Sequence, residues 1–231
     1  MSAKIQECQH TIGKAVSYSG IGLHSGKDVL MTLKPAAANT GVTFIRTDLP
    51  GCPEIKAVAE NVSSTVKATT LSANGAEVFT VEHLMAAIAL SGVDNIRIEM
   101  SSPEPPVTDG SAKVFSELLE EAGIVEQQAE RKVYAVDKAF SVYDGDRYIA
   151  VLPYDGYRIS FTSINNHPML GTQYFDVLLD KESFKKEIMP ARTVAFTYEL
   201  EMLRKMGLGL GGSLENVVVF DEEKILSEPR F

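Results

Sequence analysis

The longest uninterrupted apolar run in this sequence covers residues 84–90 and contains seven residues. It follows Thr80, a plausible helix N-cap, and ends shortly before Gly92, a typical helix stop. A helix that is apolar over most of its surface is stable only where other elements cover it. The chain must therefore bury this helix in a layered core, and the run is far shorter than the ~20 residues of a membrane-spanning helix.

Segments with the pattern of strands precede and follow this helix. Val29, Met31 and Leu33 recur at the two-residue period of a half-buried strand. Asn74-Gly75 separates two further segments, and this dipeptide favours the positive φ angles of a tight hairpin. We expect strands at residues 29–33, 42–47, 67–71, 77–79 and 95–100, and a second amphipathic helix at residues 112–122 that ends at Gly123.

The second half of the sequence repeats this order of strands and helices. Residues 127–132 are polar and charged without periodicity, so we place a linker there, between a first domain of residues 1–126 and a second of residues 127–231. Strands are expected within residues 133–164, and helices near residues 181–188 and 198–206. The predicted fold class is α+β, with two similar two-layer sandwich domains that face each other across a ligand groove. Each domain would pack helices on a mostly antiparallel sheet.

Charge and cysteine content exclude several classes of protein. With 22 basic against 31 acidic residues, the formal net charge of −9 disfavours nucleic acid as a partner. The polar residues 1–14 lack the apolar core of a secretory signal, so we expect a cytoplasmic protein, and nothing indicates an obligate protein partner. Cys8 and Cys52 form neither a disulfide framework nor a C-x-x-C pair, so any metal must use histidines and carboxylates.

The strongest candidate for chemistry is the pair Glu82 and His83, in the first turn of the apolar helix. The positive end of the helix dipole disfavours imidazolium and favours carboxylate. A neutral His83 could ligate zinc, and an ionised Glu82 could serve as a general base. The pair alone is a weak motif, because a catalytic metal takes three protein ligands and no H-E-x-x-H spacing occurs. The alternative is a histidine that hydrogen-bonds a neighbour, beside a solvent-facing glutamate.

The glycine-rich residues 207–213 form a second candidate. Their backbone N–H groups could bind a phosphate, which makes a small-molecule kinase the alternative enzyme. A phosphate-binding loop usually leads into a helix, however, whereas residues 217–220 have the pattern of a strand, and the lysine of a Walker motif is absent. A helix stop followed by close backbone packing explains the same glycines.

Four more motifs have a structural explanation beside a functional one. Thr193 could donate a hydrogen bond to a developing oxyanion, although taken alone its position between two expected helices favours a role as an N-cap. His24 lies in a turn between glycines, and His167 is extended because Pro168 follows it. Residues 109–111, Asp-Gly-Ser, fit a turn and a helix cap.

Taken together, these segments resemble one bacterial enzyme family, the UDP-3-O-acyl-N-acetylglucosamine deacetylases of lipid A and lipopolysaccharide biosynthesis. Each segment is weak alone, but their order along the chain is specific. The resemblance implies a zinc-dependent hydrolase with two similar α+β domains facing each other across the active site, and an insertion in the second domain that forms a passage for the substrate's acyl chain. The matching segments are residues 20–26, 80–84, 93–96, 108–112, 166–168, 191–193 and 207–213.

The resemblance also implies roles for single residues. His83 matches the family's first zinc ligand, and Glu82 matches its general base for the attacking water. Thr193 matches the threonine that binds substrate and steadies the oxyanion, and Phe161 matches an aromatic residue that contacts the uracil. The implied cofactor is Zn²⁺, and the implied substrate is UDP-3-O-acyl-N-acetylglucosamine, from which the N-acetyl group is removed by hydrolysis.

The sequence departs from the family pattern in one place. The family completes its site with a His-Lys-x-x-Asp segment and a later histidine that acts as general acid, and neither occurs before the sequence ends at Phe231. We therefore expect that a C-terminal part is missing and that this chain alone neither holds zinc tightly nor deacetylates. A non-catalytic module that binds an acylated sugar nucleotide remains an alternative. Val194 stands where relatives often carry an aromatic residue, and Lys67 lies in the loop leading toward the metal.

Overall fold

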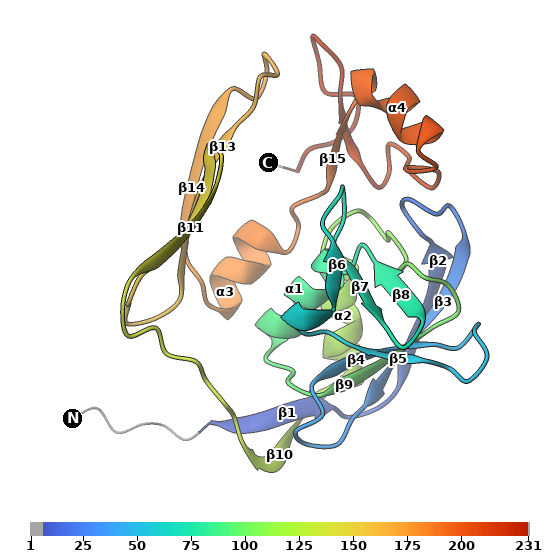
Figure 1. Ribbon diagram of the computed structural model, residues 1–231, viewed down its shortest axis with the longest axis vertical. Helices are drawn as coiled ribbons and strands as arrows, with labels where there is room; N and C mark the ends of the chain where they lie inside the picture. Colours follow the sequence, from blue (N-terminus) through green and yellow to red (C-terminus); the bar gives the residue numbers. More distant parts are fainter. Residues whose placement is uncertain (1–6, 231) are drawn as a thin grey trace.

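The computed structural model describes residues 7–230 and shows an α+β protein. Its first half is built on a five-stranded sheet in which β3 and β9 are antiparallel and β9 and β4 are parallel. Helices α1 (Glu82–Ser91) and α2 (Lys113–Ala122) lie side by side against this sheet (Figure 1). The strand order is β2 (Val16–Ile21), β3 (Asp28–Pro35), β9 (Ile96–Met100), β4 (Val42–Arg46) and β5 (Glu54–Lys56).

The core of the first half lies between this sheet and the two helices. Alternate residues of β3 are buried while Leu30, between them, is 50% exposed, so the predicted two-residue period is confirmed. Fully burying a side chain of this size contributes about 1.5–3 kcal/mol relative to leaving it in water. The most deeply buried members include Met31, Leu33, Phe44, Leu84, Ile88, Ile96, Ile98, Met100 and Leu119.

Helix α1 begins differently from the prediction and ends as predicted. Gly92 ends it with a left-handed φ of 78°. Thr80, however, is not the N-cap: the helix follows Val81, and no side chain caps it. Thr80 instead has a φ of 57°, and its hydroxyl donates a hydrogen bond of 2.7 Å to Glu104 Oε1. The hydroxyl is therefore committed to a tertiary partner rather than to the helix end.

A smaller sheet of three strands joins the first half, and it contains the predicted hairpin. Its strands are β6 (Val62–Ser64), β7 (Thr70–Ala73) and β8 (Ala76–Phe79), with the short 3-10 helix η1 (Ala59–Asn61) before them. Asn74 and Gly75 connect β7 to β8 with φ values of 53° and 74°. These positive angles are those that a two-residue turn requires, so the prediction from Asn-Gly is confirmed.

The predicted linker at residues 127–132 is wrong in its first part. Strand β10 (Ile124–Glu130) pairs antiparallel with β1 (Cys8–Ile12), so residues 127–130 belong to a strand. The prediction relied on the polar side chains of this segment, but the strand is formed by backbone hydrogen bonds while those side chains face solvent or polar partners. The Gln127 side chain, for example, accepts a hydrogen bond from Asn95. The predicted boundary between residues 126 and 127 falls inside β10.

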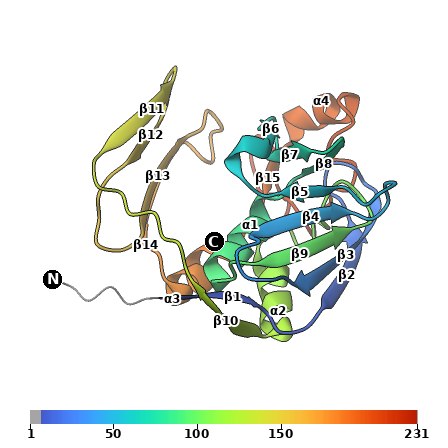
Figure 2. The same cartoon turned by 60° about the horizontal axis from the view of Figure 1, so that its bottom comes forward.

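The second half contains the expected strands and helices, but its strands form three separate pairs. The hairpins β11–β12 and β13–β14 stand apart from the first half (Figure 2), and β15 and β16 form a short parallel pair. The bounds are β11 (Phe140–Asp144), β12 (Arg147–Val151), β13 (Arg158–Ile164), β14 (Thr172–Leu178), β15 (Val194–Phe196), β16 (Val218–Phe220), α3 (Lys181–Ser183), the π-turn η2 (Phe184–Ile188), the 3-10 turn η3 (Thr197–Glu199) and α4 (Leu200–Lys205).

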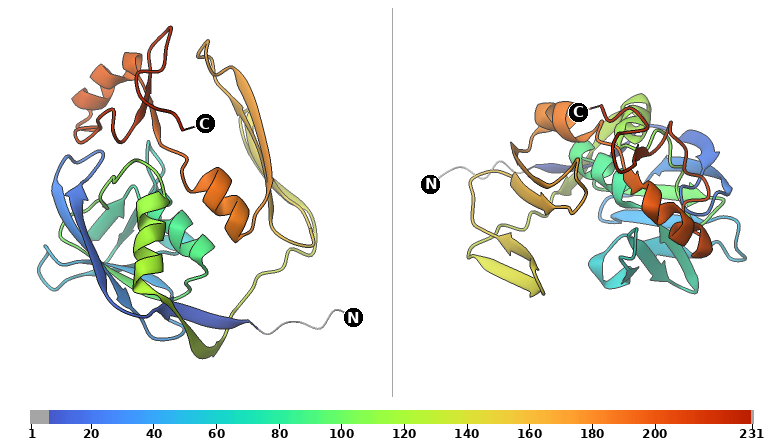
Figure 3. Two further views of the ribbon diagram at one scale, coloured as in Figure 1. Left: turned by 180° about the vertical axis from the view of Figure 1, so that it is seen from behind. Right: turned by 90° about the horizontal axis from the view of Figure 1, so that it is seen from above.

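Besides the pairing of β1 with β10, two regions of contact between the halves are found among residues 7–230. Segment α3–η2 lies between the hairpins and helices α1 and α2 (Figure 3), and Phe184 of this segment is buried in the core of the first half. Near the other end of the molecule, the region of β15, β16 and α4 meets the loops of the first half. Among residues 7–230, no helix is both long enough and apolar enough to cross a membrane.

Candidate functional site

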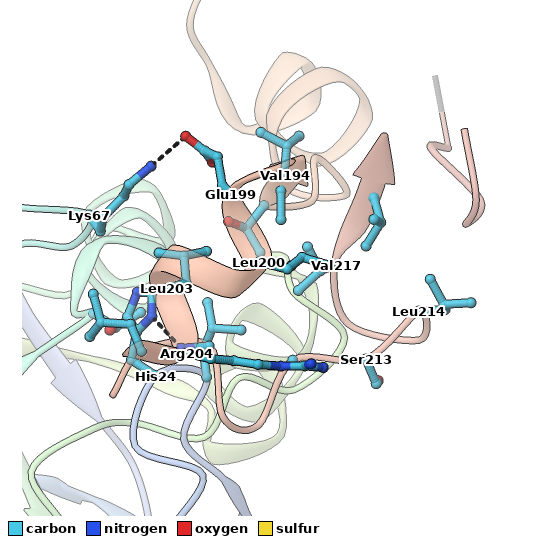
Figure 4. A pocket seen from close by; sticks show the side chains of 18 of the residues that line it. His24, Lys67, Val194, Glu199, Leu200, Leu203, Arg204, Ser213, Leu214 and Val217 are labelled. Atoms are coloured by element: carbon cyan, nitrogen blue, oxygen red, sulfur yellow. Dashed lines mark hydrogen bonds and ion pairs between the residues drawn. The ribbon is translucent and has the colours of Figure 1, made fainter. Parts of the chain in front are cut away.

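A pocket of about 340 Å³ lies where the loops of the first half meet the region of β15, β16 and α4. The first half contributes the turn after β2, the loop before β7 and the start of α1, while the second half contributes mainly apolar side chains. Figure 4 shows Lys67 and His24 toward one end of it, and Val217 and Leu214 toward the other. The pocket therefore has a mixed lining, with a few polar groups against an apolar wall, as is typical of small-molecule sites.

Glu82 and His83 both line this pocket from the first turn of α1. The Glu82 carboxylate is exposed, and its Oε2 accepts a hydrogen bond of 3.2 Å from the backbone N–H of Thr69. Burial lowers the pKa of the His83 imidazole below its usual value, against the opposing charges of Glu82 and Asp109. Burial therefore favours the neutral form of the ring, which is the form that can bind a metal. Within residues 7–230 it makes no hydrogen bond, so the alternative in which His83 bonds a neighbour lacks support.

Thr193 reaches the same pocket from the second half. Its backbone N–H donates to Gly110 O over 2.8 Å, and its carbonyl accepts from Val218 N–H over 2.9 Å. The alternative in which Thr193 caps a helix is wrong, because strand β15 follows it directly. The backbone of Thr193 is thus held between the two halves, and its side chain is available to the pocket.

The Asp-Gly-Ser turn at residues 109–111 supports that contact. Gly110 has a φ of 84°, and a Cβ there would lie 1.8 Å from Asn216 O, so only glycine allows this approach. Asp109 Oδ1 accepts hydrogen bonds from the backbone and hydroxyl of Ser111, as the predicted turn requires. Burial opposes ionisation of Asp109, but hydrogen bonds from Ser111 and Arg230 outweigh it and lower its pKa.

The glycine-rich residues 207–213 pack against the turn that contains His24. Each backbone N–H of this segment donates to an acceptor within the protein, so none is free to bind a phosphate. Gly211 approaches the backbone of Gly22 so closely that a Cβ would lie 2.2 Å from Gly22 O. The kinase alternative therefore loses its basis, and the explanation by close backbone packing is supported.

His24 is buried in this contact and also lines the pocket. Its Nδ1 accepts a hydrogen bond of 3.3 Å from Gly209 N–H, and its carbonyl accepts one of 3.2 Å from Leu210 N–H. The structural role expected for His24 is therefore confirmed. Its place in the same pocket as Glu82 and His83 was missed, because sequence spacing does not show that the turn after β2 and the start of helix α1 line one pocket.

An ion pair spans the pocket region. Lys67 Nζ lies 2.9 Å from Glu199 Oε1, and both side chains line the pocket (Figure 4). Lys67 comes from the loop before β7 with a φ of 60°, while Glu199 comes from η3. No motif in the sequence signalled Glu199, since a single acidic residue at a helix start is common on any surface.

Phe161 and His167 lie elsewhere. Phe161 is exposed on β13, beside a shallow depression formed with Gln173 and Phe175, and does not line the pocket. His167 is buried, its ring bonded to Asp221 O over 2.9 Å and packed against Phe196, which confirms its structural role.

The described residues do not fit a complete catalytic zinc site. Such a site takes three protein ligands. Within residues 7–230, no group of three or more histidine, cysteine, aspartate or glutamate side chains is arranged to hold a metal. At the pocket, the neutral ring of His83 is the group best suited to ligate zinc.

Comparisons with known proteins match nearly the whole chain to proteins of one name. Residues 9–231 match the family model described as LpxC, UDP-3-O-acyl N-acetylglycosamine deacetylase. The UDP-3-O-acyl-N-acetylglucosamine deacetylase of Myxococcus xanthus is 46% identical over 219 residues, which cover 95% of this chain and 70% of the relative. The enzymes of the same name from Hahella chejuensis and Geotalea uraniireducens are 43% and 45% identical, with 95% of this chain and 74% and 71% of the relatives covered.

Proposed function

Because the chain belongs to the UDP-3-O-acyl-N-acetylglucosamine deacetylase family, we propose that its pocket serves to remove the N-acetyl group from UDP-3-O-acyl-N-acetylglucosamine by hydrolysis, a step of lipid A biosynthesis. The observation that carries this proposal is the meeting of Glu82, His83 and Thr193 in one pocket, although they come from opposite halves of the chain. We further propose that the chain forms two similar α+β domains that face each other across this pocket, with the boundary moved from residue 126 to the end of β10, because residues 127–130 pair with β1.

The chemistry follows from what these side chains can do. Water adds to the acetamide carbonyl carbon, the C–N bond breaks, and acetate and a free amine result. Glu82 takes a proton from the water and, once protonated, can pass it to the nitrogen of the departing amine, so that the protons balance. The Thr193 hydroxyl donates a hydrogen bond to the oxygen that becomes negative as water adds. Both Glu82 and Thr193 line the pocket, which supports these roles.

The apolar wall supports an acylated substrate. Leu200, Leu203 and Val217 line the pocket and would contact a hydrocarbon chain favourably. The uracil is assigned to Phe161, whose exposed ring offers a stacking surface outside the pocket. The proposal thus separates the site of chemistry from the place where the nucleotide is held.

Zinc enters this proposal through His83 alone. Two imidazoles line the pocket, but that of His24 already accepts a hydrogen bond from Gly209, and no group of three candidate ligands is arranged to hold a metal within residues 7–230. Because a catalytic zinc needs three protein ligands, we derive no step that passes through the metal. Without added zinc, we expect the purified chain to hold much less than one equivalent of the metal and not to deacetylate. Stoichiometric zinc in protein of the correct intact mass would contradict this expectation.

The test is a titration of the 231-residue chain with UDP-3-O-acyl-N-acetylglucosamine, with and without excess zinc, followed by calorimetry and by an assay for acetate. We expect saturable binding in both conditions, and acetate only with excess zinc, because a weak site fills by mass action. Glu82→Gln should keep binding but lose about 10²–10⁴-fold in acetate release. Glu99→Gln, the same change on β9, should keep both. A chain that does not bind the substrate saturably would refute the proposal.

A binding module without turnover is the second candidate, and the absence of a group of three metal ligands among residues 7–230 favours it. Saturable binding with no acetate release under excess zinc would select this candidate. Acetate release that Glu82→Gln removes would exclude it, since a pure binding module has no need of a general base.

A further inference from the structure

Glu104 is a buried carboxylate that the proposed reaction does not use. It follows β9 in the proline-rich turn at residues 103–106, its exposure is 0%, and it does not line the pocket. Within residues 7–230 it forms no ion pair, and all its hydrogen-bond donors are neutral. A buried carboxylate is costly unless it is fully hydrogen-bonded. Its hydrogen bonds therefore account for its place in the fold.

The donors to Glu104 come from two segments that line the pocket. The backbone N–H of His24 lies 2.9 Å from Oε1 and 3.1 Å from Oε2, and that of Ser25 lies 2.8 Å from Oε2. The hydroxyl of Thr80 lies 2.7 Å from Oε1. One carboxylate thus connects the turn that contains His24 to the residue two positions before Glu82.

Both segments are shaped around this carboxylate. A Cβ on Gly22 would lie 2.4 Å from Glu104 Oε2, so the turn approaches as closely as a glycine allows. Thr80 has a φ of 57°, which is rare and unfavourable for a β-branched residue. A strained conformation persists only where its surroundings enforce it. The hydrogen bond to Glu104 is the contact that holds Thr80 in this conformation immediately before helix α1.

The same turn transmits the constraint to the second half. Gly209 donates to His24 Nδ1, and Leu210 donates to the carbonyl of His24. The glycine-rich residues 207–213 are therefore hydrogen-bonded to a turn whose backbone is itself hydrogen-bonded to Glu104.

We propose that Glu104 is a positioning residue. Its carboxylate fixes the turn that contains His24 relative to the start of helix α1, and so fixes the His24 ring relative to Glu82 and His83. The assignment of this site to catalysis rests on the function proposed above, but the geometric claim does not. Glu104 acts through Thr80 and the turn, and it contacts no reacting atom.

The experiment uses the histidine ring-proton resonances of the full chain in ¹H–¹³C correlation spectra. The chain has four histidines, of which His24 and His83 lie at the pocket while His10 and His167 lie outside it. Thr80→Val removes only the hydroxyl and keeps the branched shape, whereas Thr80→Ser keeps the hydroxyl. Glu104→Gln removes the charge, and Glu99→Gln is its matched control in the neighbouring strand.

We expect Thr80→Val and Glu104→Gln to displace the resonances of His24 and His83 and to leave those of His10 and His167 in place. Thr80→Ser should restore the native positions, and Glu99→Gln should change none of the four. If Glu104→Gln does not fold, the comparison of Thr80→Val with Thr80→Ser decides alone. Unchanged His24 and His83 resonances in Thr80→Val, or equal displacement of all four histidines, would overturn the proposal.

Turnover supplies a second readout that keeps the two proposals distinguishable. Misplacement of reacting groups by about 1 Å can cost about 100-fold in rate. Where acetate release is measured with excess zinc, Thr80→Val should lower kcat and leave KM unchanged, because it disturbs the reacting groups and not the apolar wall. If neither the native chain nor any variant binds the substrate, the proposed function is refuted. The histidine resonances still test whether Glu104 positions the His24 turn. If Thr80→Val instead raises KM while the histidine resonances stay at their native positions, the positioning role would be overturned.

Discussion

Replacing Gly110 with alanine tests whether the two halves meet at Thr193 as the structure describes. Gly110 has a φ of 84°, and its carbonyl accepts the hydrogen bond from Thr193 N–H. A Cβ there would lie 1.8 Å from the backbone oxygen of Asn216, which no rotamer change can move away. The alanine must therefore displace the backbone that holds Thr193 at the pocket.

The magnitude has two parts. A left-handed conformation costs a non-glycine residue about 1–2 kcal/mol. Forcing extra atoms into a packed contact costs about 1–3 kcal/mol more, and here the neighbour is backbone. Gly110→Ala should therefore destabilise the protein by about 2–5 kcal/mol. Gly75→Ala is the matched control, because Gly75 has a similar φ of 74° but no atom within 4 Å of the added Cβ, so only the first part applies.

Urea unfolding followed by far-ultraviolet circular dichroism measures both variants. We expect the midpoint of Gly110→Ala to fall well below that of Gly75→Ala with an unchanged slope, which identifies a change of stability rather than of compactness. Gly110→Ala should also weaken binding of the substrate, which Gly75→Ala should not. Equal midpoints for the two variants would refute the close contact between the halves, and with it the placement of Thr193.

Three further predictions concern the core, an ion pair and the response to acid. Ile98→Ala should cost about 2–5 kcal/mol in urea unfolding, because Ile98 is 0% exposed and its removal leaves a cavity; a cost below about 1 kcal/mol would contradict that burial. A double-mutant cycle on Lys67 and Glu199 should give a coupling of only about 0.2–1 kcal/mol that salt weakens, since both charges are partly exposed. The hydrogen bond from Arg46 lowers the pKa of Asp48. The stabilisation that the Asp48 carboxylate contributes is therefore present above the unfolded-state pKa of about 3.9 and is lost as pH falls through the folded-state pKa. Asp48→Asn should lower the free energy of unfolding at pH 7 and change it little at pH 2, and an equal loss at both pH values would contradict the pKa shift.

Local sequence patterns predicted most elements of the fold. The alternation in residues 29–33, the Asn74-Gly75 turn and the helix stop at Gly92 all lie where the structure has them. These features depend on neighbours in the chain, so a single sequence contains the information. Strand β10 was missed because its polar side chains hide a backbone ladder, and the ladder partner β1 is more than 100 residues away.

The candidate site was predicted in part. The resemblance pointed to Glu82, His83 and Thr193, and all three line one pocket. The partners that surround them gave no signal. Glu104 lies in a proline-rich turn, a sequence pattern typical of the protein surface, yet it is completely buried. Glu199 reads as an ordinary helix-start acid, yet it pairs with Lys67 across the pocket region.

The sequence by itself determined most of the segments that become strands and helices, where the tight turns fall and which family the chain resembles, because each of these depends on short-range periodicity or on the order of motifs. Only the tertiary structure decided that Thr80 would bond Glu104 instead of capping its helix, and that residues 207–213 would use every N–H within the protein. The physical reason is competition: a hydroxyl or an N–H has several possible partners, and long-range packing determines which of them is within reach.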